Sequence, residues 1–149
     1  MPHIPKINLE RVLYNMPGLC FWKDIHFQYL GASKEMLNSI GLKSVNDIIG
    51  KKDQDMPWYN DADLYQEQDK LALKGQIQFK VNTFLRTDGA RVVHLVKKGP
   101  LMDDNKKPIG IIGVGFCLTK HNYADLFSLL AFMGFSLSDF ILTIEKKKI

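Results

Sequence analysis

Hydrophobic and polar positions follow two different periods along this chain. From Ile77 to Leu85, apolar or β-branched residues alternate with mostly polar ones. The turn sequence Asp88-Gly89 follows, so this segment is predicted to be a strand that ends in a tight hairpin. From Ile7 to Met16, apolar residues recur at helical spacing until Pro17-Gly18, which predicts a short amphipathic helix. The chain is therefore expected to combine strands with helices.

The remaining segments extend this pattern to five strands, with helices between and after them. Ser33 and Ser44 are each suited to cap a helix, and Asn60 resembles the start of a longer one. The other strands are expected at Leu19–Asp24, Phe27–Ala32, Val92–Val96 and Ile109–Leu118, and the helices at Ser33–Gly41, Ser44–Gly50 and Asn60–Gly75. A hairpin and a meander separated by helices favour an α+β fold, an antiparallel sheet with helices over one face.

Beyond Thr119 the spacing of apolar residues becomes helical again. An apolar stripe runs from Leu126 to Ile144, and Gly134 with Ser136 can divide it into two helices. Further apolar residues lie off this stripe, so we expect these helices to pack against a partner or another part of the chain.

Composition narrows the class of protein. The 149 residues amount to about one domain, and 46% hydrophobic with 24% charged residues is typical of a globular protein. The net charge of +4 includes three adjacent lysines, Lys146 to Lys148, so no basic stripe indicates direct nucleic-acid binding. Cys20 and Cys117 form neither a disulfide framework nor a zinc motif. No segment resembles a membrane span or a signal peptide, so we expect a cytoplasmic protein without membrane contact.

Several short motifs, taken together and in order, resemble a PAS domain over roughly Leu9 to Lys120. They are MPG at Met16–Gly18, WKD at Trp22–Asp24, YLGAS at Tyr29–Ser33, IIGKKDQDMPW at Ile48–Trp58, and the segment Phe84–Thr119 with its two turns and glycine-rich last strand. The resemblance implies a five-stranded antiparallel sheet in the order 2-1-5-4-3. It also implies a non-catalytic sensory module, as in bacterial sensor kinases of two-component systems or LuxR-type transcription regulators. The expected parts are an N-terminal helix at 1–17, the PAS sensory domain at 18–120, and a C-terminal helical extension at 121–149 for signalling or dimerisation.

Two departures from the family pattern bear on signalling. Ser33 stands where relatives usually carry an asparagine, and Cys117-Leu118-Thr119 replaces the usual Asp-Ile-Thr. In the family, that aspartate helps to couple the sheet to the outgoing helix. This chain therefore lacks the family's coupling residue, although Thr119 can still cap a helix.

The sequence assembles no catalytic site and no metal site. Gly110, Gly113 and Gly115 lie inside a strand and lack the spacing of a nucleotide-binding loop, so we expect them to allow close approach of a neighbouring group. His94 has no second ligand at metal-binding spacing. The remaining candidates occur where caps and turns need carboxylates, and we interpret them as structural: Asp53, Asp55, Asp61, Asp63, Asp103 and Asp104.

A curved sheet covered by short helices can enclose a pocket for a small molecule. Five residues are expected to line it, four aromatic side chains and a histidine as the polar group: Tyr29, Trp58, Phe79, Phe116 and His94. Ordinary core packing is the alternative for each. The cofactor is unknown. The predicted helix at Asn60–Gly75 has no histidine for haem iron, and no helical cysteine is placed for a flavin adduct.

Two classes of function follow from these patterns. The first is a sensory module that binds a small molecule, forms a homodimer, or does both, and so regulates an output domain, a kinase or a DNA-binding domain, in cis or in trans. The alternative is a ligand-free protein–protein interaction adaptor, and a small hydrolase or transferase is disfavoured. We also expect Cys20 and Cys117 to lie near each other on neighbouring strands, without a bond. Truncation after Lys120 is expected to leave the core folded and to weaken self-association.

Overall fold

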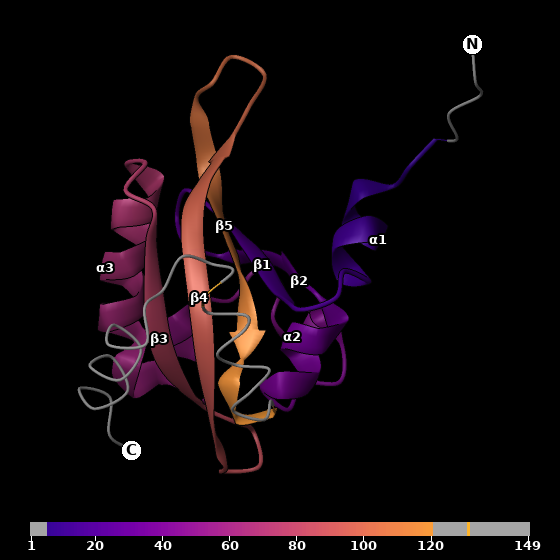
Figure 1. The fold of residues 1–149 in the computed structure, drawn as a ribbon, viewed down its shortest axis with the longest axis vertical. Coiled ribbons are helices and arrows are strands. Elements are labelled where there is room, and N and C mark those ends of the chain that lie inside the picture. The colour runs from indigo at the N-terminus through magenta and orange to yellow at the C-terminus, as the bar shows by residue number, and fades with distance from the viewer. Residues whose placement is uncertain (1–5, 121–130, 132–149) are drawn as a thin grey trace.

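The structure is a computed structural model that describes residues 6–120 and residue 131. Its centre is a five-stranded antiparallel sheet in the order β2-β1-β5-β4-β3 (Figure 1). The strands are β1 Leu19–Asp24, β2 Tyr29–Ala32, β3 Gln78–Leu85, β4 Arg91–Met102 and β5 Pro108–Cys117. The predicted fold class and strand order are confirmed.

Within residues 6–120, three α-helices and four short 3₁₀ turns accompany the sheet. The helices are α1 Leu9–Tyr14, α2 Lys34–Ser39 and α3 Ala62–Leu73, and the turns are η1 Val45–Asp47, η2 Asp53–Asp55, η3 Tyr59–Asp61 and η4 Leu118–Lys120. Helices α2 and α3 pack against the sheet, whereas α1 stands off to one side near β2 (Figure 1). The helices predicted between Leu126 and Ile144 lie outside the described residues.

Local capping explains where the helical segments begin. The Ser33 side chain accepts a hydrogen bond from the backbone nitrogen of Met36, as predicted, and Ser44 with Asp47 forms the predicted capping box. That second segment is a single 3₁₀ turn. The start predicted at Asn60 is wrong, because a 3₁₀ turn occupies Tyr59–Asp61 and α3 begins at Ala62.

Strand β4 is longer than its apolar pattern predicts. Lys97, Lys98 and Gly99 interrupt that pattern after Val96, but the ladder with β5 continues as far as the pair Met102 and Pro108. The β4–β5 hairpin therefore projects past the ends of the other strands (Figure 1).

All three of the glycines singled out in β5 allow the close approach that the sequence predicts, and a Cβ atom on Gly110 would overlap the carbonyl oxygen of Lys23 in β1. A Cβ atom on Gly115 would overlap the carbonyl oxygen of Leu95 in β4, and a Cβ on Gly113 would overlap the ring of Phe21 in β1. Side chains at these three positions would separate β5 from its neighbours or displace a core ring.

The two cysteines occupy neighbouring strands, as the predicted strand order requires. Cys20 is paired with Val114 in the sheet register, three positions before Cys117. Since side chains alternate along a strand, this odd spacing directs the two thiols to opposite faces of the sheet. Both cysteines are free and buried, and burial raises the pKa of Cys20 to about 11. They are unbonded, as expected, but they do not face each other.

Candidate functional site

Four charged side chains meet inside the domain, between the sheet and α3. Lys23 comes from β1, Asp53 from η2, Asp69 from α3 and Lys98 from β4, and each is at most 5% exposed. Lys23 Nζ lies 2.7 Å from Asp53 Oδ2 and 2.6 Å from Asp69 Oδ2. Lys98 Nζ lies 2.8 Å from Asp69 Oδ1. We call this continuous network of two cations and two anions the buried charge cluster.

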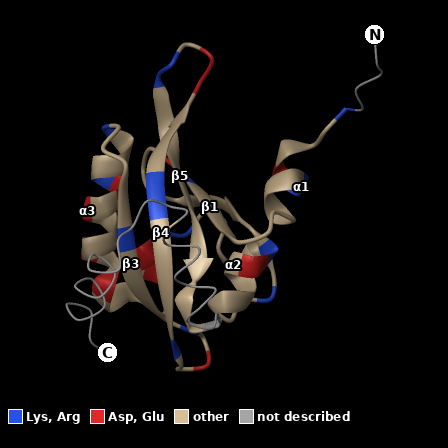
Figure 2. Cartoon of the chain, viewed as in Figure 1, with Lys and Arg blue, Asp and Glu red and all other residues tan. Residues whose placement is uncertain are grey.

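Strand and helix periodicity direct these residues inward. Lys98 lies four residues after His94 in β4, and the even spacing keeps both on the helix-covered face. Asp69 lies one helical turn after Tyr65 in α3, so both belong to the buried side of that helix. Figure 2 shows basic residues in the middle of β4 and acidic segments directly behind β3 and β4.

Asp53 anchors the loop before α3 to the sheet. In addition to Lys23, its Oδ1 atom accepts hydrogen bonds from the Tyr29 hydroxyl and from Trp58 Nε1, both at 2.7 Å. Burial by itself would raise the pKa of this carboxyl group, but Lys23, Trp58 and Tyr29 outweigh burial and hold the pKa below its ordinary value. Asp53 is therefore ionised in the folded protein and ties η2 to β1 and β2.

The two buried lysines differ in how well their charges are compensated. Burial by itself would lower the pKa of both side chains, because it disfavours the charged form. For Lys23, attraction to Asp53 and Asp69 outweighs burial and brings the pKa above its ordinary value. For Lys98, burial prevails over attraction to Asp69, and repulsion from Lys23 adds to it, so the pKa is lowered. Lys98 is thus the less well compensated of the two lysines.

Aromatic rings surround both ammonium groups. Lys23 Nζ lies 4.5 Å from the ring centroid of Tyr29. Lys98 Nζ lies 5.7 Å from the centroid of Phe21 and 5.8 Å from that of Tyr65. At these distances the negative faces of the rings add to the stabilisation of the cations. The site therefore offers flat apolar surfaces beside a charged donor.

A neutral amide pair joins α3 to β3 next to the buried charge cluster. Gln68 Nε2 donates to Asn82 Oδ1, and Asn82 Nδ2 donates back to Gln68 Oε1, each at 2.9 Å. The Tyr65 hydroxyl donates to the carbonyl oxygen of Thr83 close by. Both contacts join α3 to β3, so this side of the interface between helix and sheet is held by polar bonds.

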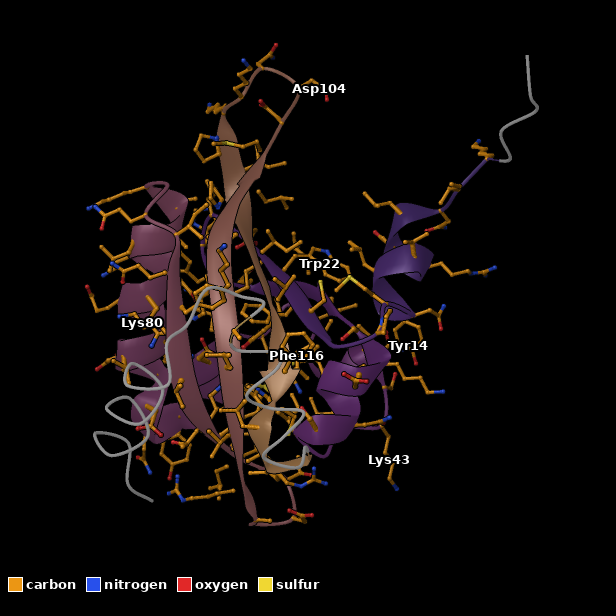
Figure 3. All side chains as sticks on the ribbon, in the orientation of Figure 1. Tyr14, Trp22, Lys43, Lys80, Asp104 and Phe116 are labelled. Carbon is orange, nitrogen blue, oxygen red and sulfur yellow. The ribbon has the colours of Figure 1, made fainter. Side chains whose placement is uncertain are left out.

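A small recess opens beside Lys98 at the C-terminal end of α3. Its volume is about 10 Å³, which is room for about one water molecule. It is lined by Gln68, Leu71, Gln76, Gln78, Lys80 and Lys98. Figure 3 labels Lys80 on this side of the molecule. In this conformation the recess admits no molecule larger than water to the charge cluster.

Three of the five residues predicted to line a pocket lie on the helix-covered face. Tyr29 and Trp58 meet at Asp53, as described above. His94 Nε2 lies 3.0 Å from Ser39 Oγ, and its ring is 4.8 Å from that of Phe84. All three predicted residues are at most 2% exposed.

The other two predicted pocket residues belong to the opposite face of the sheet. Phe79 is paired with Lys97, and Phe116 is paired with Leu95. Directly opposed residues of antiparallel strands share a face, and Lys97 and Leu95 alternate with the inward-facing His94 and Lys98. The structure therefore separates Phe79 and Phe116 from Tyr29, Trp58 and His94.

The charged members of the site are absent from the sequence prediction. The interpretation of Asp53 as a capping residue is wrong, because its carboxylate bonds to buried side chains, whereas Asp55 does accept a hydrogen bond from the backbone nitrogen of Lys52. Two signals in the sequence point to Lys98 and Asp69. Lys98 has the strand parity of His94, and Asp69 falls on the same helix face as Tyr65.

A second, larger depression lies on the surface beside α1. It is a groove of about 290 Å³ between α1 and the edge of the sheet, and Tyr14, Trp22 and Leu30 are among its lining residues (Figure 3). Helix α1 buries none of its residues, and Leu9 and Val12 remain 67% and 48% exposed. This end of the molecule presents an apolar surface to its surroundings.

Within residues 6–120 and 131, no group of three or more His, Cys, Asp or Glu side chains could hold a metal ion. None of the helices in the same residues is long and apolar enough to cross a membrane.

The sheet order, the helices over one face and the enclosed polar site define the class of protein. The model of the PAS fold family matches residues 13–120, and the chain belongs to this family. It is a sensory module, as the sequence resemblance implies. A search of curated protein sequences found no match.

Solved structures supply more particular relatives. VqmA of Vibrio cholerae in a ligand–DNA complex is 26% identical, with a TM-score of 0.69 over 85% of this chain and 57% of VqmA. A VqmA dimer without target DNA, described as a LuxR-type receptor, is 28% identical, with a TM-score of 0.66 over 76% of this chain and 52% of VqmA. The chain thus spans little more than half the length of VqmA. A Rhodobacter sphaeroides LOV protein is 16% identical and shares the fold, with a TM-score of 0.62 over 78% of this chain and 68% of that one.

Proposed function

We propose that this PAS module senses a small polar molecule that binds at the buried charge cluster and contacts Lys98. The observation that carries the proposal is the cluster itself. Replacing buried ion pairs by apolar residues is often neutral or stabilising, so two lysines inside a small domain are poorly explained by stability alone. Buried ionisable groups held by specific charged partners are often found at functional sites.

The chemistry of Lys98 indicates what the molecule must offer. An ammonium group has three donors, and among the described residues the Lys98 side chain is hydrogen-bonded to Asp69. A ligand therefore needs an acceptor oxygen or nitrogen that reaches Lys98 Nζ. The rings of Phe21 and Tyr65, whose centroids lie 5.7 and 5.8 Å from Lys98 Nζ, favour a flat body. A small heteroaromatic molecule with one acceptor group satisfies both conditions.

The relatives supply a probe for this proposal. A VqmA structure that is 29% identical to this chain, with a TM-score of 0.66 over 76% of it, is described as bound to DPO. We therefore expect DPO to bind this chain with saturable heat in isothermal titration calorimetry.

Two neighbouring lysines of β4 make a matched pair for this titration. Lys98→Met should weaken binding about 10- to 100-fold, the range expected for loss of one hydrogen bond to a charged group. Lys97→Met should leave affinity unchanged, because Lys97 is exposed on the opposite face of the same strand. Absence of saturable heat with DPO, or equal losses in the two variants, would contradict binding at the cluster.

A second candidate function is favoured by the closed state of the site. The recess beside Lys98 has room for about one water, and the charges of the cluster satisfy one another. A filled interior of this kind suits an adaptor that binds protein partners without a ligand. Failure of the titration above would favour this candidate.

We further propose that the module acts as a cytoplasmic homodimer on a DNA-binding output domain, in cis or in trans. The support comes from the VqmA structures, which are described as a dimer and as a complex with ligand and DNA. The exposed apolar residues of α1 offer a surface for self-association.

A further inference from the structure

Helix α3 covers the buried charge cluster, and its contact with the sheet is unusually polar. Five of its residues are buried: Ala62, Tyr65, Gln68, Asp69 and Ala72. Three of these make hydrogen bonds to the sheet strands, and the other two are alanines, which bury little apolar area. Large apolar side chains supply most of the stability of an ordinary amphipathic helix, whereas α3 is held on the sheet by these polar bonds together with the packing of the Tyr65 ring on Phe84.

An exposed turn with open space around its glycine connects the C-terminal end of α3 to β3. The helix ends at Leu73 with Lys74 as its C-cap residue, and Gly75 has a φ of 86° with no atom near the position of a Cβ. Ile77, two residues later, is 53% exposed. The recess beside Lys98 lies at this same end of the helix. Displacement of this end from β3 would therefore enlarge the recess and lead directly to Lys98.

We propose that α3 is a movable lid over the interior site and that the reciprocal Gln68–Asn82 amide pair holds it closed. The pair is neutral, so water can satisfy both amides when the lid opens. Asp69 travels with α3, whereas Asp53 lies on η2 and keeps its bonds to Lys23 and Trp58. Opening thus separates Asp69 from both Lys98 and Lys23, and Lys23 keeps its ion pair with Asp53.

The role of the lid as an entrance rests on the proposed ligand site, but its opening is measured without any ligand. Hydrogen exchange of the full chain, followed by mass spectrometry, reports opening of α3 separately from unfolding of the sheet. In Asn82→Leu, which removes one amide of the pair, the backbone amides of α3 should exchange about tenfold faster, because one buried amide loses its partner. Those of β1 and β5 should keep their wild-type rates.

The same helix provides a control for this measurement. Gln66 accepts a hydrogen bond from Gln54 at 3.0 Å in an exposed side-chain amide pair. Gln66→Leu should leave the exchange of α3 unchanged. Should Asn82→Leu fail to fold, Gln68→Ala removes the pair from the helix side, beside the recess, where water can reach Asn82.

The exchange and titration experiments test the lid and the ligand site separately. Unchanged exchange of α3 in the pair variants, or an equal rise in α3 and in the sheet, would overturn the lid. Faster exchange confined to α3 supports it, even if DPO does not bind. If DPO binds while α3 exchange is unaffected by loss of the pair, the proposed function survives and the lid does not.

Discussion

Lys23 and Lys98 have the same side chain and similar burial, yet their partners give them different roles. Lys23 is bonded to both aspartates of the cluster. Lys98 is bonded to Asp69, which is also bonded to Lys23. Loss of a buried cation destabilises a protein mainly through the carboxylates it leaves unpaired. The two lysines are therefore not interchangeable for stability.

Substitution of the two lysines by methionine tests this difference. Lys23→Met should lower the free energy of unfolding by about 3–5 kcal/mol, because Asp53 loses its cation. Lys98→Met should change it by about 1 kcal/mol or less, because Asp69 keeps Lys23 and a poorly compensated charge is removed. Urea unfolding at pH 7, followed by tryptophan fluorescence, measures both values. Equal losses would contradict the unequal roles.

Protonation of Asp53 at acid pH should lower the free energy of unfolding. The pKa of this carboxyl group is lowered in the folded state, so its ionised form contributes stability at every pH above the unfolded value of about 3.9. That contribution is lost as the pH falls below about 4 towards the folded pKa. We expect the free energy of unfolding of the wild type to drop between pH 5 and pH 3, to be measured by urea unfolding at each pH.

The variant Asp53→Asn is the control for this pH dependence. It should be less stable than the wild type at pH 7, because Lys23 and Trp58 lose a charged acceptor. It should lose less stability on acidification, because position 53 no longer titrates. An equally steep loss in the variant would assign the acid sensitivity to other groups.

At the scale of the elements, close approach between β4 and β5 depends on glycine. Gly115 faces the backbone of Leu95, which cannot move aside as a flexible side chain can. Gly99 also lies in β4, but a Cβ there would meet the side chain of Ile77 at an ordinary contact distance of 3.5 Å.

Alanine at these two glycines should therefore have opposite consequences. Gly115→Ala should lower the free energy of unfolding by about 1–3 kcal/mol, because it forces the two strands apart. Gly99→Ala should be neutral or slightly stabilising, since alanine restricts the unfolded chain more than glycine does. Thermal unfolding followed by circular dichroism compares the two variants. A tolerated Gly115→Ala would contradict the close approach.

At the scale of the whole molecule, α1 is the element least integrated into the described domain. Its Leu9 and Val12 are exposed, and other residues of α1 line the surface groove at the β2 edge of the sheet. An apolar patch of this kind often marks an interaction surface. In the proposed dimer, this surface contacts the second copy.

Charged substitutions on α1 test the proposed dimer. The double variant Leu9→Asp/Val12→Asp should have the mass of a monomer by light scattering at concentrations where the wild type is a dimer, because two carboxylates would be buried in the interface. Its unfolding should be unchanged at low concentration, since both side chains are exposed in the single chain. Ile77→Asp, equally exposed but at the β3 edge of the sheet, should remain dimeric. A dimeric double variant would place the interface elsewhere.

Local patterns in the sequence determined the strands, the caps at Ser33 and Ser44, and the family, from which the strand order follows. Hydrophobic periodicity is a property of neighbouring residues, so it needs no knowledge of distant contacts. Because these patterns are local, they miss structure that depends on contacts with distant parts of the chain. The second half of β4 is a strand because of its ladder with β5, despite two lysines and a glycine that break the apolar pattern.

The tertiary structure alone decided which residues form the interior site. Lys23 meets Asp53 across 30 residues and Asp69 across 46, from three different elements, and no local pattern encodes such a meeting. The face on which Phe79 and Phe116 lie likewise depends on the register of whole strands. A buried charge is stable only where the folded chain brings an opposite charge to it. For that reason the sequence could show that these lysines and aspartates exist, while only the packing of α3 and η2 against the sheet made them a site.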